Sequence, residues 1–198
     1  CDGLISVTLP ESVDHICDWA FSHCTNLKTV TIHGLKSVCE GELFGDCNNL
    51  ETVILGKEVT LSAWELSDVF AGGYYSKTSS AIKNIIVLEG NPKYYSKDNC
   101  VIERETKMLV IAGCEAQIPS DGSVTKIGRC AFRINRQRSN IRIPSCITAV
   151  ESDAFNGFNL LTDVWYEGSE QDKNNISIST SGNDALLSAT WHYNTCKA

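Results

Sequence analysis

The sequence lacks any long hydrophobic run. Nowhere in its 198 residues do about 18 apolar residues follow one another, the length that a membrane-spanning helix requires. No basic and apolar leader precedes the first apolar pattern, which begins at Leu4. We therefore expect no transmembrane segment, and we expect the chain to be a mature or trimmed fragment.

Positive charge is also scarce. The 17 Lys and Arg residues are outnumbered by 24 Asp and Glu residues, which gives a net charge of −7. Binding to nucleic acid needs clustered Lys and Arg that neutralise phosphates. The basic cluster at residues 129–138 also contains Cys130 and Phe132, so we expect a solvated loop there. Nucleic acid is not expected among the partners.

Signatures of catalysis and of metal binding are missing as well. The sequence contains no H-E-x-x-H, no G-x-S-x-G and no Walker loop. Its ten cysteines are spaced more widely than the paired C-x₂₋₄-C ligands of zinc sites. We therefore expect no enzyme, no catalytic residue, no cofactor and no metal.

What the sequence does contain is an internal repeat. Apolar residues recur at a step of 23 residues, as Leu4, Leu27 and Leu50 show. The same step separates several further groups: Val7, Val30 and Val53; Leu9, Ile32 and Leu55; Phe21 and Phe44; Phe132 and Phe155. A fixed period of this length is the sequence signature of a repeat architecture.

Each unit begins with a short alternating segment. In residues 4–9 the apolar positions that recur in the repeat are Leu4, Val7 and Leu9, and Ser6 and Thr8 lie between them, which is typical of a half-buried strand. Pro10, Pro119 and Pro144 follow such segments and are expected to end a strand. A second apolar group follows in each unit, and we expect it to form a turn and a tight, partly helical return.

Such a unit cannot bury its apolar side alone. Stacking on a neighbour about 4.8 Å away turns each Leu, Val and Phe position into a continuous core column. About seven strand positions can be assigned in this way, one of them at Glu115 and Gln117.

The unit resembles the BspA-like leucine-rich-repeat family. That family's unit is L-x-x-V-x-I-P-x-x-V-x-x-I-x-x-x-A-F-x-x-C-x-x-L, which residues 4–27 follow closely and residues 124–132 and 143–155 match in its middle portion. Residues 91–102 and 108–112 are similar to the family's hairpin insert, and residues 182–193 resemble its C-terminal cap.

The resemblance implies a leucine-rich-repeat solenoid of a β-rich α/β class. Short parallel strands would stack at a repeat of about 23 residues, with a β-hairpin insert and a C-terminal cap. We expect one domain over residues 1–198, divided into regular repeats (1–55), an irregular coil and hairpin insert (56–117), further repeats (118–168) and the cap (169–198).

The departures from the family pattern include Leu43 in place of alanine, and Asn135 and Phe158 in place of the late-repeat cysteine. His33 and Gly34 stand where proline is expected. Residues 56–81 match poorly and contain Gly72 and Gly73, so we expect an enlarged loop in that coil.

The cysteines fall into two sets, one expected to remain free thiols and one that could form disulfides. Cys24 and Cys47 occupy the same repeat position and are expected to stack, as buried free thiols in preference to a disulfide. The better disulfide candidates are Cys17 with Cys39, and Cys100 with Cys114 at the ends of the hairpin insert.

Alternation along the strands also predicts which side chains face solvent. With Leu4, Val7 and Leu9 directed inward, the residues between them must point outward. The predicted binding residues on this strand face are Ser6, Thr8, Thr29, Thr31, Thr52, Ile54, Asn84, Ile86, Asn140, Arg142, Asp163 and Trp165. One expectation is that Trp165 is exposed and forms an anchor for a partner together with the neighbouring Tyr166. The other is that Trp165 packs under the C-terminal cap.

The resemblance implies an extracellular or cell-surface protein related to adhesins. Its partners would be host or microbial surface proteins or glycans, bound on a preformed sheet. The alternative is a structural or targeting repeat module of a larger surface protein that carries an enzymatic or anchoring domain elsewhere. Fold alone does not decide between the two.

Overall fold

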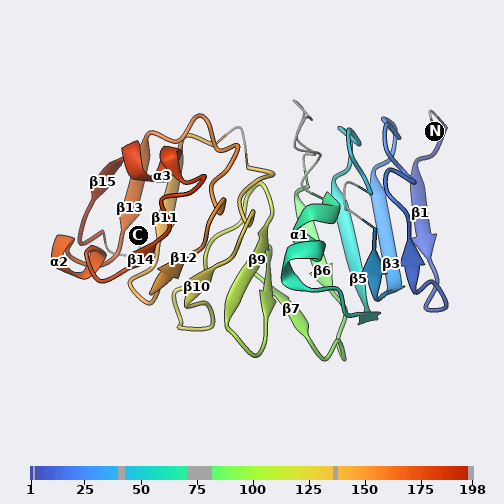
Figure 1. Ribbon diagram of the computed structural model, residues 1–198, viewed down its shortest axis with the longest axis horizontal. Helices are drawn as coiled ribbons and strands as arrows, with labels where there is room; N and C mark the ends of the chain where they lie inside the picture. The colour runs from blue at the N-terminus through green and yellow to red at the C-terminus, as the bar shows by residue number, and fades with distance from the viewer. Residues whose placement is uncertain (2, 40–42, 71–81, 136–137, 196–198) are drawn as a thin grey trace.

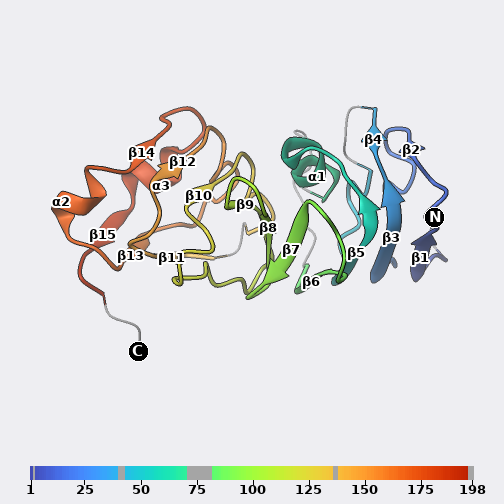
Figure 2. The same cartoon turned by 90° about the horizontal axis from the view of Figure 1, so that it is seen from below.

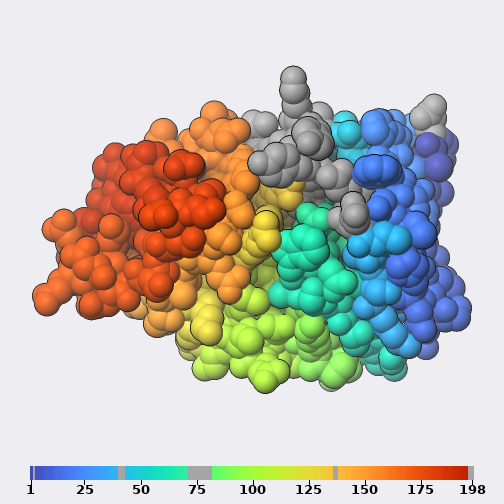
Figure 3. Space-filling view, in the orientation of Figure 1, coloured from blue at the N-terminus to red at the C-terminus, as the bar shows by residue number. Residues whose placement is uncertain are grey.

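The computed structural model describes residues 1, 3–39, 43–70, 82–135 and 138–195. Within these ranges the chain forms a β-solenoid of about 7 turns with parallel strands at roughly 23-residue spacing. Successive coils lie side by side from the N-terminal to the C-terminal end (Figure 1), and their side chains pack against one another as consecutive bands of colour (Figure 3). The predicted leucine-rich-repeat solenoid is therefore confirmed.

A four-stranded parallel sheet covers one side of the first coils. Val7 pairs with Val30 and Val30 with Val53, so the residues that share a repeat position lie in one row. The row continues to Ile85 on the fourth strand. The strands, in spatial order, are β1 (Ser6–Leu9), β3 (Thr29–Leu35), β5 (Thr52–Val59) and β6 (Asn84–Val87).

Two of the three prolines expected to end a strand do so, whereas no strand directly precedes Pro119. Pro10 directly follows the last residue of the four-residue strand β1, and Pro144 directly follows β11. Where His33 and Gly34 replace proline, β3 continues to 7 residues. Gly34 is needed there, because a Cβ atom at this position would lie 2.6 Å from the carbonyl oxygen of Glu11.

A second parallel sheet lies on the same side of the later coils. Its order is β11 (Asn140–Ile143), β13 (Asp163–Tyr166) and β15 (Thr190–His192). Figure 2 shows this sheet and the β1-β3-β5-β6 sheet along the lower side of the molecule. We call the outward surface of these two sheets the strand face.

The opposite side, here called the return side, differs from expectation. Its return segments are mostly two-residue parallel strands, so the predicted partly helical returns are wrong for these coils. Pairing across coils satisfies their backbone N–H and C=O groups without a helix. The short strands are β2 (His15–Ile16) with β4 (Ser37–Val38), and β10 (Lys126–Ile127), β12 (Ala149–Val150) and β14 (Ser177–Ile178).

The return of the third coil does become helical, as α1 (Ala63–Phe70). Ser62 and Glu65 begin this helix with reciprocal bonds: the Ser62 N–H donates to the Glu65 carboxylate (2.8 Å), and the Glu65 N–H donates to the Ser62 hydroxyl (3.2 Å). The enlarged loop predicted beside it, including Gly72 and Gly73, falls within 71–81 and so outside the described residues.

The hairpin insert divides the core. Strands β7 (Tyr94–Lys97), β8 (Cys100–Glu103) and β9 (Met108–Ala112) pair antiparallel, and β9 then pairs parallel with β10. Along β8, Val101 packs into the N-terminal core cluster, whereas Cys100 and Ile102 pack into the C-terminal one. The predicted hairpin insert is confirmed.

The strand predicted at Glu115 and Gln117 is wrong, because residues 113–119 contain no strand. Their backbone bonds go elsewhere: the Cys114 N–H donates to the Ile82 carbonyl and the Gln117 N–H to the Asp98 carbonyl. The strand face is therefore interrupted between β6 and β11.

The C-terminal cap contains α2 (Glu170–Lys173), α3 (Asp184–Ser188) and β15. Leu186 of α3 is fully buried in the C-terminal core cluster. Asn183, also fully buried, ties the cap to the preceding coil: its amide nitrogen donates to the Glu151 carbonyl, and its amide oxygen accepts from the Phe155 N–H.

Stacked phenylalanines run through both halves of the core. The rings of Phe21 and Phe44 lie 5.3 Å apart, and those of Phe44 and Phe70 lie 5.5 Å apart. Phe132 and Phe155 are 4.9 Å apart in the C-terminal half. The predicted phenylalanine columns are thus confirmed. Among the described residues no helix is both long and apolar enough to cross a membrane.

Candidate binding surface

The first sheet brings eight of the twelve predicted residues into two parallel rows. Pairing between neighbouring strands places Ser6, Thr29, Thr52 and Asn84 in one row, and Thr8, Thr31, Ile54 and Ile86 in the other. All eight are exposed or half-buried. We call these eight residues the N-terminal strand patch.

The N-terminal strand patch is polar at one end and partly apolar at the other. Five of its eight members are Ser or Thr, whose short hydroxyls can both donate and accept hydrogen bonds. The β6 end adds the Asn84 amide and Ile86, which is 44% exposed. The Asn84 amide nitrogen lies 3.4 Å from the Thr52 hydroxyl, so neighbouring coils are also linked along the row.

Side chains of the hairpin insert occupy the outer edge of β6. The Ile85 N–H donates to the Asn99 amide oxygen (2.8 Å), and the Val87 N–H donates to the Ser96 hydroxyl (3.0 Å). The Asn99 amide nitrogen donates to the Lys83 carbonyl. These bonds replace the ones that a next strand would supply, and they protect the sheet edge.

A hollow of about 450 Å³ opens where the strand face is interrupted. Its lining is mostly polar and carries both signs of charge, from Lys83 and from Asp98 and Glu115. Asn84 and Ile86 of the N-terminal strand patch form part of its wall. Glu115 and Gln117, although not on a strand, still line this side of the molecule.

The second sheet carries the remaining four predicted residues, Asn140, Arg142, Asp163 and Trp165. Asn140 pairs with Asp163, and Arg142 with Trp165. We call these four the C-terminal strand patch. Arg142 is held by two partners: its Nε lies 3.2 Å from Glu167 Oε1, and its Nη2 donates to the Thr195 carbonyl (2.9 Å).

Trp165 combines the two expected arrangements. One ring face stacks on His192 of the cap, yet 41% of the residue remains exposed. Tyr166 does not contribute to the surface as expected, because it is 1% exposed and packs edge-on against Trp191. The reason is strand alternation, which points Tyr166 inward when Trp165 points outward.

Two residues of this surface, Thr190 and His192, were not predicted from the sequence. Strand β15 pairs Thr190 with Asp163 and His192 with Trp165, so both extend the rows of the C-terminal strand patch. The spacing from Asp163 to Thr190 is 27 residues, which breaks the 23-residue step. The alternation of polar Thr190, apolar Trp191 and polar His192 is the feature of the sequence that could have indicated this strand.

Hydrogen bonding lowers the pKa of one carboxyl group of the C-terminal strand patch, that of Asp163. Asp163 Oδ1 lies 2.7 Å from His192 Nε2, and the Thr162 hydroxyl donates to Asp163 Oδ2 (2.8 Å). Both bonds favour the charged form, so they lower the pKa of Asp163 below its usual value, His192 having the larger effect.

The cysteines that the structure describes are all free thiols. Cys17 and Cys39 lie next to each other beside His15. Cys100 and Cys114 bond different groups, since the Cys100 thiol donates to the Gln117 carbonyl and the Cys114 thiol to the Ile134 carbonyl. Burial raises the pKa of Cys100 to about 12. Whether either pair forms a disulfide stays a prediction.

Comparison with known proteins adds a family match. The model of the BspA type leucine-rich-repeat region matches residues 1–67 and 113–181, in 6 copies. No curated protein sequence matches the chain.

Three solved structures are similar to the chain. The pneumococcal vaccine antigen PcpA is 14% identical with a TM-score of 0.41, over 81% of this chain and 52% of that one. A leucine-rich-repeat protein from Eubacterium ventriosum is 11% identical with a TM-score of 0.39, over 84% and 60%. A leucine-rich cell surface protein from Faecalibacterium prausnitzii is 18% identical with a TM-score of 0.24, over 90% and 83%. The chain spans less than two thirds of the first two.

Proposed function

The chain belongs to the BspA-type leucine-rich-repeat family, and on this premise we propose that it is a non-enzymatic binding protein of the cell surface or extracellular space. It recognises protein or glycan partners through the strand face. Its action is adhesin-like: surface complementarity on a preformed sheet, without a chemical step.

The observation that carries this proposal is the register of the outward rows. Four coils place Ser6, Thr29, Thr52 and Asn84 side by side at the spacing of hydrogen-bonded strands, about 4.8 Å. Such a surface is rigid before the partner arrives, because each strand is fixed by the ladder and by the core beneath it. A preformed surface loses little conformational entropy on binding.

The chemistry of the two patches suits partners with both polar and apolar groups. The hydroxyls and the one amide of the N-terminal strand patch can bond the hydroxyls of a glycan or the polar groups of a protein. Ile86 and Trp165 offer exposed apolar area, and Trp is enriched among residues that dominate binding energy. The hollow between the patches extends the surface with charges of both signs.

The test is binding of the labelled chain to a panel of purified extracellular proteins and to a glycan array. Thr31→Arg inserts a long charged side chain between Thr8 and Ile54 in the outward row, and Trp165→Ala removes the exposed aromatic. Each is expected to weaken binding at least about tenfold, equal to about 1.4 kcal/mol. Lys126→Glu on the return side, where Lys126 is exposed, is the matched control and should bind as the unchanged chain does.

Two outcomes overturn the proposal. If Lys126→Glu abolishes binding while Thr31→Arg and Trp165→Ala leave it intact, the strand face is not the binding surface. If the folded chain binds no member of the panel, the alternative of a structural or targeting module of a larger surface protein replaces it.

A further inference from the structure

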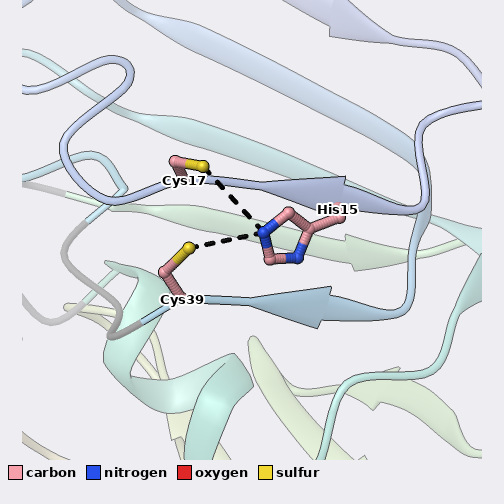
Figure 4. A group of neighbouring side chains, drawn as sticks. All are labelled: His15, Cys17 and Cys39. Atoms are coloured by element: carbon pink, nitrogen blue, oxygen red, sulfur yellow. Dashed lines mark hydrogen bonds between the residues drawn. The ribbon is translucent and has the colours of Figure 1, made fainter.

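The first two returns bring together three side chains of the types that bind thiophilic metals. His15, Cys17 and Cys39 converge on one point of the return side, although Cys39 comes from a different coil (Figure 4). His15 Nε2 lies 3.9 Å from Cys17 Sγ and 3.3 Å from Cys39 Sγ. All three ligand atoms lie within 4.8 Å of one another.

Strand pairing fixes this arrangement. Strands β2 and β4 are parallel, and they pair His15 with Ser37 and Ile16 with Val38. The next position on each strand is a cysteine, so Cys17 and Cys39 emerge side by side where the two strands end. His15 and Cys17 are two residues apart and therefore share one face of β2.

Ser37 orients the imidazole. Its hydroxyl oxygen lies 2.9 Å from His15 Nδ1, whereas the two sulfurs contact the other ring nitrogen, Nε2. In the tautomer that a metal needs, Nδ1 carries the proton and donates it to this hydroxyl, and the Nε2 lone pair then faces Cys17 and Cys39. Metal-binding histidines are generally held by such a second bond.

The distances fit a tetrahedral ion. Bonds of about 2.3 Å to sulfur and about 2.0 Å to nitrogen place ligand atoms about 3.5 Å (N to S) and about 3.8 Å (S to S) apart in a tetrahedron. The observed Nε2–Sγ distances of 3.9 and 3.3 Å lie on either side of that value. The 4.8 Å limit means that the sulfurs need to approach by no more than about 1 Å.

We propose that His15, Cys17 and Cys39 form a zinc site in the reduced protein, with the fourth coordination position open to solvent. Two thiolates and an imidazole are soft to borderline ligands, which select zinc over calcium or magnesium. Two thiolates balance the charge of Zn²⁺, and Asp18 adds negative charge beside Cys39. All three ligand residues are exposed, so the ion can enter without unfolding the coil.

No metal was expected because no cysteine pair has the close sequence spacing of zinc ligands. The site proposed here does not depend on that spacing. Paired ligands of zinc sites are usually close in sequence, whereas Cys17 and Cys39 are brought together by the stacking of two coils. The disulfide candidate and the zinc site use the same two sulfurs, so only the thiol form can hold the ion.

The test is a zinc titration of the reduced full chain in competition with a chromophoric chelator. The unchanged chain is expected to take up one equivalent, and Co²⁺ in its place should show thiolate-to-cobalt charge-transfer absorption. Cys17→Ser, Cys39→Ser and His15→Gln should each weaken zinc binding more than about 100-fold, and Ser37→Ala about tenfold. The matched controls are Cys1→Ser and His23→Gln, which change exposed residues elsewhere and should bind as the unchanged chain does.

Circular dichroism of each variant separates loss of ligand from loss of fold. Zinc affinity that is equal in the unchanged chain, Cys17→Ser and Cys39→Ser overturns the site, as does binding that is lost in Cys1→Ser instead. Purified protein that contains a Cys17–Cys39 disulfide by peptide mapping, and binds no zinc after reduction, shows that the pair is a disulfide and also refutes the proposal. None of these outcomes bears on the strand face, so this test and that of the proposed function fail separately.

Discussion

The indole of Trp165 and the imidazole of His192 stack with their ring centroids 4.0 Å apart and their planes 14° from parallel. The same imidazole is held from its edge by Asp163, at 2.7 Å. Trp165 is therefore fixed in position before any partner arrives, on the outward surface of β13. This arrangement joins the C-terminal cap to the strand face and makes the cap part of the proposed binding surface.

The bond between Asp163 and His192 predicts a dependence of stability on pH. Because the pKa of Asp163 is lowered in the folded state, the carboxylate stabilises the fold above its ordinary pKa of about 3.9 and loses that contribution as pH falls through the folded-state pKa. The melting temperature of the unchanged chain should exceed that of Asp163→Asn above about pH 5, and the gap should close in acid. In a His192→Ala background the gap above about pH 5 should be smaller. A gap that widens on acidification contradicts this account.

The phenylalanine column predicts a graded loss of stability. Phe44 is 2% exposed and stacks between Phe21 and Phe70, so Phe44→Ala should lower the free energy of unfolding by about 3–5 kcal/mol. Phe21 lies at one end of the column and is half-buried, so Phe21→Ala should cost about 1–2 kcal/mol. Urea denaturation measures both. Equal losses would show that the column is not continuous.

Hydrogen bonds of the Asn91 side chain hold the hairpin insert against the third coil, and we expect their loss to destabilise the fold. Its buried amide donates to the Gly56 and Val59 carbonyls and accepts from the Lys93 and Tyr94 N–H groups. Asn91→Ala leaves these buried groups without partners and should cost about 3 kcal/mol.

The control for Asn91 is the exposed Asn84, whose replacement by Ala should change the free energy of unfolding by less than about 0.5 kcal/mol. Chemical denaturation of the two variants compares them directly. If both cost the same small amount, the Asn91 amide does not hold the insert in place.

Burial predicts which thiols react. The pKa of Cys47 is raised to about 11 and that of Cys100 to about 12, chiefly by burial, so at pH 8 only about one Cys100 thiol in ten thousand is the reactive thiolate. In the reduced, metal-free chain, iodoacetamide should label exposed Cys1 and Cys17 within minutes and Cys100 only after unfolding, as peptide mapping would show. Rapid labelling of Cys100 in the folded chain would contradict its placement in the core.

The parts of this structure that follow from local repetition could be predicted. A constant 23-residue step fixes which residues share a column, so the rows through Val7, Val30 and Val53 and the outward rows beside them follow from alternation. The hairpin insert and the cap were predicted instead from their similarity to the insert and the cap of the BspA-like family.

The remaining features depend on contacts between segments that no local pattern records. The first return was predicted to be partly helical, but it forms a strand because His15 pairs with Ser37 of the next coil. Asn99 and Ser96 end the first sheet at β6, and so remove the strand expected at Glu115 and Gln117. His192 joins the surface through a spacing that belongs to no repeat.

The strand face is the surface that we expect to contact a partner. Photo-crosslinking tests this directly, with a photoreactive amino acid placed at Thr31 or Ile86 on the strand face, or at Lys126 or Glu151 on the return side. The partner is whichever purified extracellular protein the binding panel identifies. We predict covalent adducts from Thr31 and Ile86 and none from the other two positions. Adducts from Lys126 or Glu151, with none from the strand face, would contradict the account.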